Sequence, residues 1–130
     1  MKLTTLVSSL LTLTTPTLAC LHVYGNIVGD PFTDDSAWGV FAVDNGRIVC
    51  SSDMGARFDQ DNHFSMGCLP GYVYAFTRDG RNAWFANPSN AYSWVQSNHP
   101  VEGNCYGACD DKHGVCICGK DYSWDQWQFC

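Results

Sequence analysis

Basic residues are scarce in this chain. It has 7 Lys and Arg against 13 Asp and Glu, and its formal net charge is −6. A surface with this charge repels the phosphates of nucleic acids and of anionic lipids. We therefore expect neither a nucleic-acid partner nor a membrane partner.

Known catalytic patterns are also missing. The sequence has no G-x-S-x-G nucleophile motif, and its four histidines show none of the spacings, such as H-E-x-x-H, that hold a metal. Glu102 is the single glutamate, and nothing in the pattern marks one of the twelve aspartates as its partner for glycoside hydrolysis. We expect no catalytic residue, no metal and no cofactor, and hence a protein that is not an enzyme.

An apolar run long enough to cross a bilayer is absent as well. The run at 3–13 is diluted with Thr and Ser and is shorter than the ~20 residues that a membrane span needs. It follows Lys2 and precedes Pro16, and small residues lead up to Ala19, which is the pattern of a signal peptide. We expect residues 1–19 to be removed, leaving one extracellular domain of residues 20–130.

Cysteine, in contrast, is abundant. In a secreted chain an even number of cysteines predicts disulfides rather than metal ligands. We expect all eight to pair: Cys20, Cys50, Cys68, Cys105, Cys109, Cys116, Cys118 and Cys130. Cys116 and Cys118 are too close to pair with each other. If the ends of the mature chain lie together, Cys20 and Cys130 can join them, but the spacing leaves the connectivity open.

Turn signals divide the body of the chain into short strands. Asn45-Gly46 and Asp79-Gly80 each lie between strand-like runs, and both predict tight hairpins. Residues 51–66 are polar and predict an irregular segment. The strand-like runs are 21–27, 38–43, 47–50, 72–77, 82–86 and 91–95.

These elements predict a mainly β fold. We expect a small antiparallel β-sandwich or barrel that is stapled by disulfides. After Asn98 the composition becomes rich in Gly and Cys, which predicts a cross-linked C-terminal tail.

Aromatic residues gather in two places, before Val95 and at the C-terminus. Their flat rings, next to Asp and Asn, suit sugar binding or a protein interface, whereas the alternative is that they fill the core. Both alternatives stay open for each cluster. The candidate binding residues are Trp84, Tyr92, Trp94, Trp124 and Trp127.

As a whole, the chain resembles the small secreted cysteine-rich proteins of fungi. A leader that ends at Ala19, a cysteine at each end of the mature chain, eight cysteines and an acidic β-rich body carry the resemblance. The resemblance implies an effector that acts in the apoplast, where it binds an extracellular host protein and modulates virulence or defence. The alternatives are a lectin-like module that binds cell-wall polysaccharide, and a small secreted hydrolase.

Overall fold

The computed structural model describes residues 20–32, 34–107 and 116–130. Within these residues the chain forms nine β-strands and no helix. The strands are β1 (Leu21–Val28), β2 (Ser36–Asp44), β3 (Arg47–Phe58), β4 (His63–Cys68), β5 (Val73–Thr77), β6 (Asn82–Ala86), β7 (Ala91–Val95), β8 (His99–Gly107) and β9 (Cys116–Gln128). The predicted signal peptide, residues 1–19, lies outside the described residues and stays a prediction.

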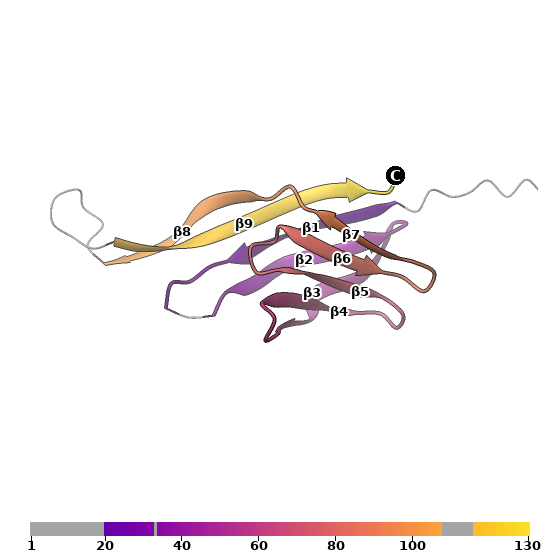
Figure 1. The fold of residues 1–130 in the computed structure, drawn as a ribbon, viewed down its shortest axis with the longest axis horizontal. Helices are drawn as coiled ribbons and strands as arrows, with labels where there is room; N and C mark the ends of the chain where they lie inside the picture. The colour runs from indigo at the N-terminus through magenta and orange to yellow at the C-terminus, as the bar shows by residue number, and fades with distance from the viewer. Residues whose placement is uncertain (1–19, 33, 108–115) are drawn as a thin grey trace, which may run out of the picture.

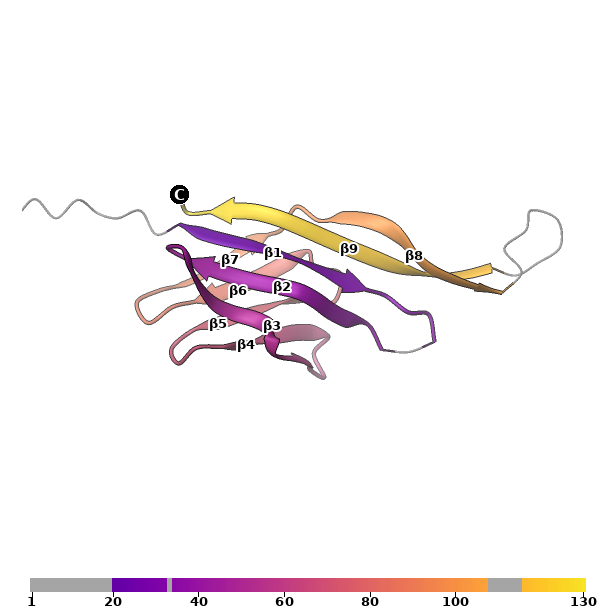
Figure 2. The same cartoon turned by 180° about the vertical axis from the view of Figure 1, so that it is seen from behind.

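All nine strands belong to one antiparallel sheet with the order β7-β6-β5-β4-β3-β2-β1-β9-β8. Strands β1 to β7 follow one another as a meander, whereas β9 lies between β1 and β8. The sheet curls into a half-barrel, and the β8–β9 hairpin reaches beyond its body (Figure 1, Figure 2). The predicted mainly β, antiparallel fold with disulfides is confirmed.

The two predicted hairpins are present. Asn45 and Gly46 connect β2 to β3, and both have positive φ values, of 50° and 79°, as this tight turn requires. Gly80, with φ 66°, turns the chain between β5 and β6. The hydroxyl of Thr77 donates a hydrogen bond of 2.6 Å to Asp79 within this second turn. Local sequence therefore determines both connections.

The segment 51–66 is not irregular, so this prediction was wrong. It contains the second half of β3, a turn, and the start of β4. The pairing register shifts between Ser51 and Ala56, and the residues between them form a bulge. Phe64 and Met66 alternate with polar residues and point into the core, so half of β4 is apolar although the segment as a whole is polar.

The Cys- and Gly-rich C-terminus is part of the sheet. Residues 116–128 form β9, which pairs with β1 from Leu21↔Gln128 to Ile27↔Tyr122. The sequence analysis missed this strand, because its partner lies at the other end of the chain.

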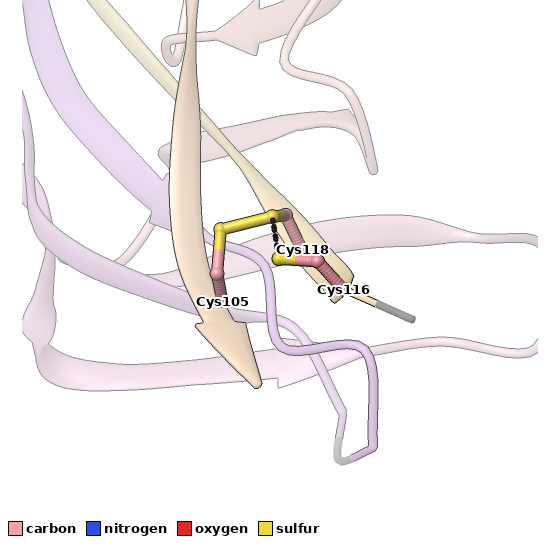
Figure 3. Close-up of side chains that lie close together, drawn as sticks. All are labelled: Cys105, Cys116 and Cys118. Carbon is pink, nitrogen blue, oxygen red and sulfur yellow. Dashed lines mark hydrogen bonds between the residues drawn. A yellow bond between two sulfur atoms is a disulfide. The ribbon is translucent and has the colours of Figure 1, made fainter. Parts of the chain in front are cut away.

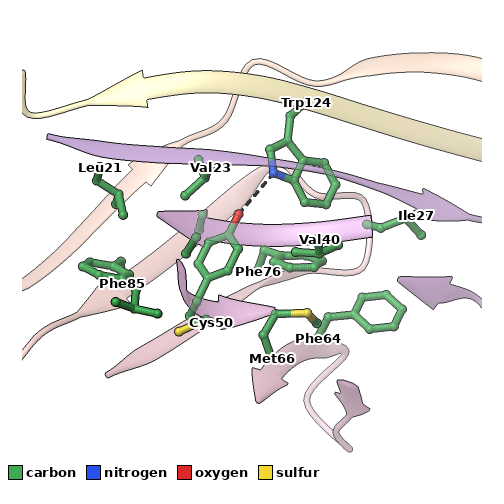
Figure 4. Packing of buried hydrophobic residues seen from close by; sticks show 14 residues of the cluster. Leu21, Val23, Ile27, Val40, Cys50, Phe64, Met66, Phe76, Phe85 and Trp124 are labelled. Carbon is green, nitrogen blue, oxygen red and sulfur yellow. Dashed lines mark hydrogen bonds between the residues drawn. The ribbon is translucent and has the colours of Figure 1, made fainter. Parts of the chain in front are cut away.

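The core fills the concave side of the sheet, where the buried side chains of seven strands meet (Figure 4). Every second residue of β1 points inward, as Leu21, Val23 and Ile27 show. From the other wall, Tyr74 and Phe76 are fully buried. The buried set also contains Val40, Ala42, Val49, Cys50, Phe64, Met66, Ala83, Phe85 and Trp124.

One polar chain crosses this core. The indole Nε1 of Trp124 donates to the hydroxyl of Tyr74 over 3.1 Å, and that hydroxyl donates to Gln96 Oε1 over 2.9 Å. The amide of Gln96 in turn donates to the Gly80 carbonyl over 2.7 Å. Burial raises the pKa of the Tyr74 hydroxyl far above its ordinary value, and the hydrogen bond from Trp124 offsets a part of that effect. These bonds satisfy polar groups that would otherwise be costly to bury.

Three disulfides join described residues. Cys20–Cys130 links the two ends of the folded chain, which confirms the pairing that the sequence suggested. Cys50–Cys68 joins facing positions of β3 and β4, and Cys105–Cys118 does the same for β8 and β9. Cys116 is also disulfide-bonded, and Cys109 lies outside the described residues.

Candidate interaction surface

Trp84 and Trp94 lie on the adjacent strands β6 and β7, but they point to opposite faces of the sheet. Residues that face each other in an antiparallel pair share one side of the sheet. Trp94 faces Ala83, which is fully buried, whereas Trp84 faces Ser93, which is exposed. These two tryptophans therefore do not form one platform.

Tyr92 and Trp94 line the concave face together. Tyr92 is opposite the buried Phe85, and Trp94 lies parallel to Tyr74 with ring centroids 6.5 Å apart. Phe129 covers both, at centroid distances of 4.3 Å from Tyr92 and 6.0 Å from Trp94. Tyr92 and Trp94 thus extend the core toward its open side. The fold does not present them as a separate contact surface.

The two C-terminal candidates also separate. Trp124 is 3% exposed and belongs to the core, so for this residue the structure favours the core alternative over the binding one. Trp127, three positions later in β9, is 61% exposed on the outer face of the sheet. The alternation of β9 accounts for this difference.

The outer face of the half-barrel over β9, β1, β2 and β3 carries a group of aromatic and aliphatic side chains. We call it the aromatic face, and it consists of Trp127, His22, Tyr24, Phe41, Trp38, Val43 and Ile48. Trp38 is 62% exposed and Ile48 is 44% exposed, so the group is open to solvent. Neither residue was among the candidates from the sequence.

Strand pairing brings these side chains together. His22 of β1 faces Trp127 of β9, and Tyr24 of β1 faces Phe41 of β2. Directly facing residues on one side of a sheet are close enough for their side chains to touch. The aromatic face therefore follows from the position of β1 between β2 and β9.

The rings form a row across three strands. The imidazole of His22 lies 4.1 Å from the indole of Trp127, and the two planes differ by 3°. His22 also contacts Tyr24 at 4.8 Å with a tilt of 39°. Tyr24 then stacks on Phe41 at 5.1 Å and 25°. Such offset contacts stabilise the row and hold its rings in fixed orientations.

One polar contact borders the row. The Nε2 atom of His22 lies 2.7 Å from Oδ1 of Asp125, whose side chain is 75% exposed. This contact orients the imidazole between its aromatic neighbours. It also places a carboxylate beside the rings, because Asp125 faces Tyr24 across the β1–β9 pair.

A shallow hollow opens beside the aromatic face. It has a volume of about 310 Å³, and Tyr24, Asn26, His99 and Asp125 contribute to its walls. Its floor includes Gly39, whose left-handed φ of 57° belongs to an irregular part of the β1–β2 pairing. The hollow is large enough to accept a side chain of a partner.

The sequence contained a signal for part of this surface. Tyr24 and Phe41 occupy the outward positions of strands whose other residues are apolar, and large aromatic residues are unusual at such positions when they have no partner. The pairing of β1 with β9 could not be inferred, so His22 remained an isolated histidine in the sequence analysis.

Three cysteine sulfurs lie close together on the β8–β9 hairpin. The Sγ atoms of Cys105, Cys116 and Cys118 are within 4.8 Å of one another (Figure 3). All three cysteines are disulfide-bonded, so in this oxidised state they do not offer the thiolates that a metal ion requires. The cluster is therefore a covalent staple of the hairpin.

Comparisons of the chain with protein families, with characterised proteins and with solved structures find no match. Among the described residues no helix is long and apolar enough to cross a membrane.

Proposed function

We propose that this chain is a secreted, effector-like protein that binds an extracellular host protein through the aromatic face and modulates defence without catalysis. The observation that carries the proposal is the row of ordered rings from Trp127 to Phe41, which ends in the exposed Trp127, together with the exposed Trp38 farther along β2. The disulfides and the acidic charge agree with an extracellular setting.

The composition of the aromatic face is that of a protein interface. The core of such an interface is enriched in Trp, Tyr and Phe and depleted of charged residues. The members of the aromatic face are uncharged apart from what His22 can carry, and one carboxylate, Asp125, lies beside them, facing Tyr24 and contacting His22. Val43 and Ile48 extend the apolar area beyond the rings. Exposed apolar groups of this kind are common at interaction sites, which supports the proposal.

The ring geometry leaves the middle rings of the row little open face for stacking. A sugar stacks with its C–H side on the open face of an aromatic ring. Here His22 lies between Trp127 and Tyr24, and Tyr24 lies between His22 and Phe41, so neighbouring rings cover the faces of the middle ones. Their edges remain available, and edges pack well against apolar side chains of a protein.

The test is a capture experiment with the oxidised, secreted protein. Immobilised wild type and a Trp38→Ala/Trp127→Ala double variant are exposed to plant apoplastic fluid and, separately, to insoluble chitin, glucan and cellulose. We expect a host protein that binds the wild type and not the double variant. Retention on a polysaccharide with loss in the double variant would instead make the aromatic face a carbohydrate platform.

A second assay addresses the absence of catalysis. Purified protein is incubated with polysaccharide, peptide and RNA substrates. Turnover that a single Asp or His substitution abolishes would contradict the non-catalytic part of the proposal.

A further inference from the structure

A polar cleft lies at the end of the half-barrel where the β3–β4 turn, the β5–β6 turn and the segment after β1 meet β9. Its volume is about 530 Å³, which is within the range of small-molecule sites. Its walls include Asn62, Thr77, Asn82, Lys120 and Tyr122. The cleft shares no residue with the aromatic face and has no role in the function proposed above.

The segments that frame the cleft are tied to one another. The side chain of Arg78, in the β5–β6 turn, donates to Asp35, which precedes β2. The backbone N–H of Arg78 donates to the carbonyl of Asn62, in the β3–β4 turn, over 3.0 Å. These bonds join three separate loops. A site whose loops are fixed before binding loses less entropy when a ligand enters.

The back of the cleft depends on two glycines. A Cβ atom on Gly119 would lie 1.7 Å from the carbonyl oxygen of Gly29, and a Cβ atom on Gly29 would lie 2.3 Å from the carbonyl oxygen of Lys120. Glycine at both positions allows β9 to pass directly against the segment after β1. This close approach places Lys120 and Tyr122 in the wall of the cleft.

Some of the charged groups inside the cleft are held by other side chains or by the backbone. Asp35 neutralises Arg78, and this hydrogen bond raises the pKa of the guanidinium above its ordinary value. Asp30 accepts hydrogen bonds from the N–H of Phe32 and the hydroxyl of Tyr106. Asp61, Asp79 and Lys120 also line the cleft, so its charges are of both signs with an acidic excess, which disfavours an anionic ligand.

The cleft also offers uncharged donors and acceptors. The side-chain amides of Asn62 and Asn82 and the hydroxyl of Tyr122 make no hydrogen bond to any other described residue. An amide and a hydroxyl can each donate and accept. The ring of Tyr122 and the ring of Pro31 add apolar surface beside them.

We propose that this cleft binds a neutral, hydroxyl-rich small molecule of the size of a mono- or disaccharide. Such a ligand matches amides and hydroxyls with its own hydroxyls and lays its C–H side against the rings. His63 lies at the cleft and contacts Trp84 with ring centroids 4.9 Å apart. Trp84, 37% exposed, extends the site on the outer face with one more aromatic ring.

The experiment titrates ¹⁵N-labelled oxidised protein with three neutral disaccharides, N,N′-diacetylchitobiose, cellobiose and laminaribiose, and with two charged compounds, spermidine and inositol hexakisphosphate. We expect at least one disaccharide to cause saturable shifts of the backbone amides of Asn62, Asn82 and Lys120. No shift at these residues up to about 10 mM of each sugar overturns the proposal, because such binding would be weaker than that of a functional site. Saturation of the same residues by a charged compound alone overturns it too.

Two variants locate the site. Asn82→Ala removes an exposed amide of the cleft and should weaken disaccharide binding about tenfold, as loss of a hydrogen bond to a ligand does. Asn90→Ala removes an exposed amide in the β6–β7 turn, outside the cleft, and should leave the affinity unchanged. Equal affinities of both variants would place the sugar elsewhere. The Trp38→Ala/Trp127→Ala variant should keep the disaccharide affinity, so failure at the aromatic face and failure at the cleft are distinguishable.

Discussion

The imidazole of His22 and the indole of Trp127 lie face to face, with their centroids 4.1 Å apart and their planes 3° from parallel. One residue comes from the first strand and the other from the last, and the Cys20–Cys130 disulfide joins the chain just beyond them. The surface to which we assign binding is therefore built from both ends of the chain.

We predict that the exposed tryptophans contribute to binding rather than to folding. Trp38→Ala and Trp127→Ala should each weaken binding of the captured host protein by more than ~1 kcal/mol. They should lower the free energy of unfolding by less than ~1.5 kcal/mol, since they remove at most one ring contact at the surface. Calorimetric titration and urea unfolding measure the two quantities. Trp84→Ala, outside the aromatic face, is the control and should bind as the wild type does.

For Trp124 the prediction is the reverse. Trp124→Ala leaves a cavity and removes the hydrogen bond to Tyr74, so it should lower the free energy of unfolding by about 3–5 kcal/mol. Urea unfolding followed by tryptophan fluorescence checks this. A variant as stable as the wild type would show that the ring is not part of the core.

Alkaline pH should destabilise the protein through Tyr74. Burial raises its pKa in the folded state above the ordinary value of 10.0, so above pH 10 the unfolded chain releases a proton that the folded chain retains. The contribution of Tyr74 to the free energy of unfolding is fully present below pH 10. Above pH 10 it falls by up to about 1.4 kcal/mol per pH unit. We expect the free energy of unfolding, measured with urea between about pH 9 and 11, to fall less steeply with pH in Tyr74→Phe than in the wild type. Equal slopes would mean that Tyr74 ionises without unfolding.

We expect the disulfides to contribute different amounts to the free energy of unfolding. Cys20–Cys130 spans 110 residues and Cys105–Cys118 spans 13. In the chain-entropy model a loop of ~100 residues contributes about 4.7 kcal/mol and one of ~15 residues about 3 kcal/mol. Cys20→Ser/Cys130→Ser should therefore be less stable than Cys105→Ser/Cys118→Ser by roughly 1.5 kcal/mol. Urea unfolding without reductant compares them, and the opposite order would show that the hairpin staple is the more important one.

Secretion should remove residues 1–19. The charged start, apolar run and small residues before Cys20 predict this cleavage. N-terminal sequencing of the protein from culture medium should begin at Cys20. A retained leader, or a lipid on Cys20, contradicts the prediction.

The sequence predicted what depends on neighbours in the chain. Asn45-Gly46 and Asp79-Gly80 determine their hairpins because the turn itself requires positive φ, and the alternation of Leu21, Val23 and Ile27 identifies the inner face of β1. The strand β4 was not predicted, because its inward-facing apolar residues, such as Phe64, are separated by polar ones.

What depends on distant pairing could not be predicted. Whether Trp84 and Trp94 share a face depends on the register of β6 against β7, and the row from Trp127 to Phe41 depends on β1 lying between β2 and β9. Neither relationship leaves a local pattern, so the sequence left core and surface open for Trp124 and did not single out Trp38.

The interior position of β9 in the strand order makes the last strand of the described chain a neighbour of the first. A chain that is exported from its N-terminus can form the meander from β1 to β7 while its last residues are still in transit, but one edge of β1 then remains unpaired. The closing of that edge is a non-local step, which is slow in β proteins. Until β9 pairs with β1, Trp127 does not stack on His22. During this time the unpaired edge of β1 can pair with other chains and aggregate. We expect competence to bind the host to be the final event of folding, reached only after export is complete.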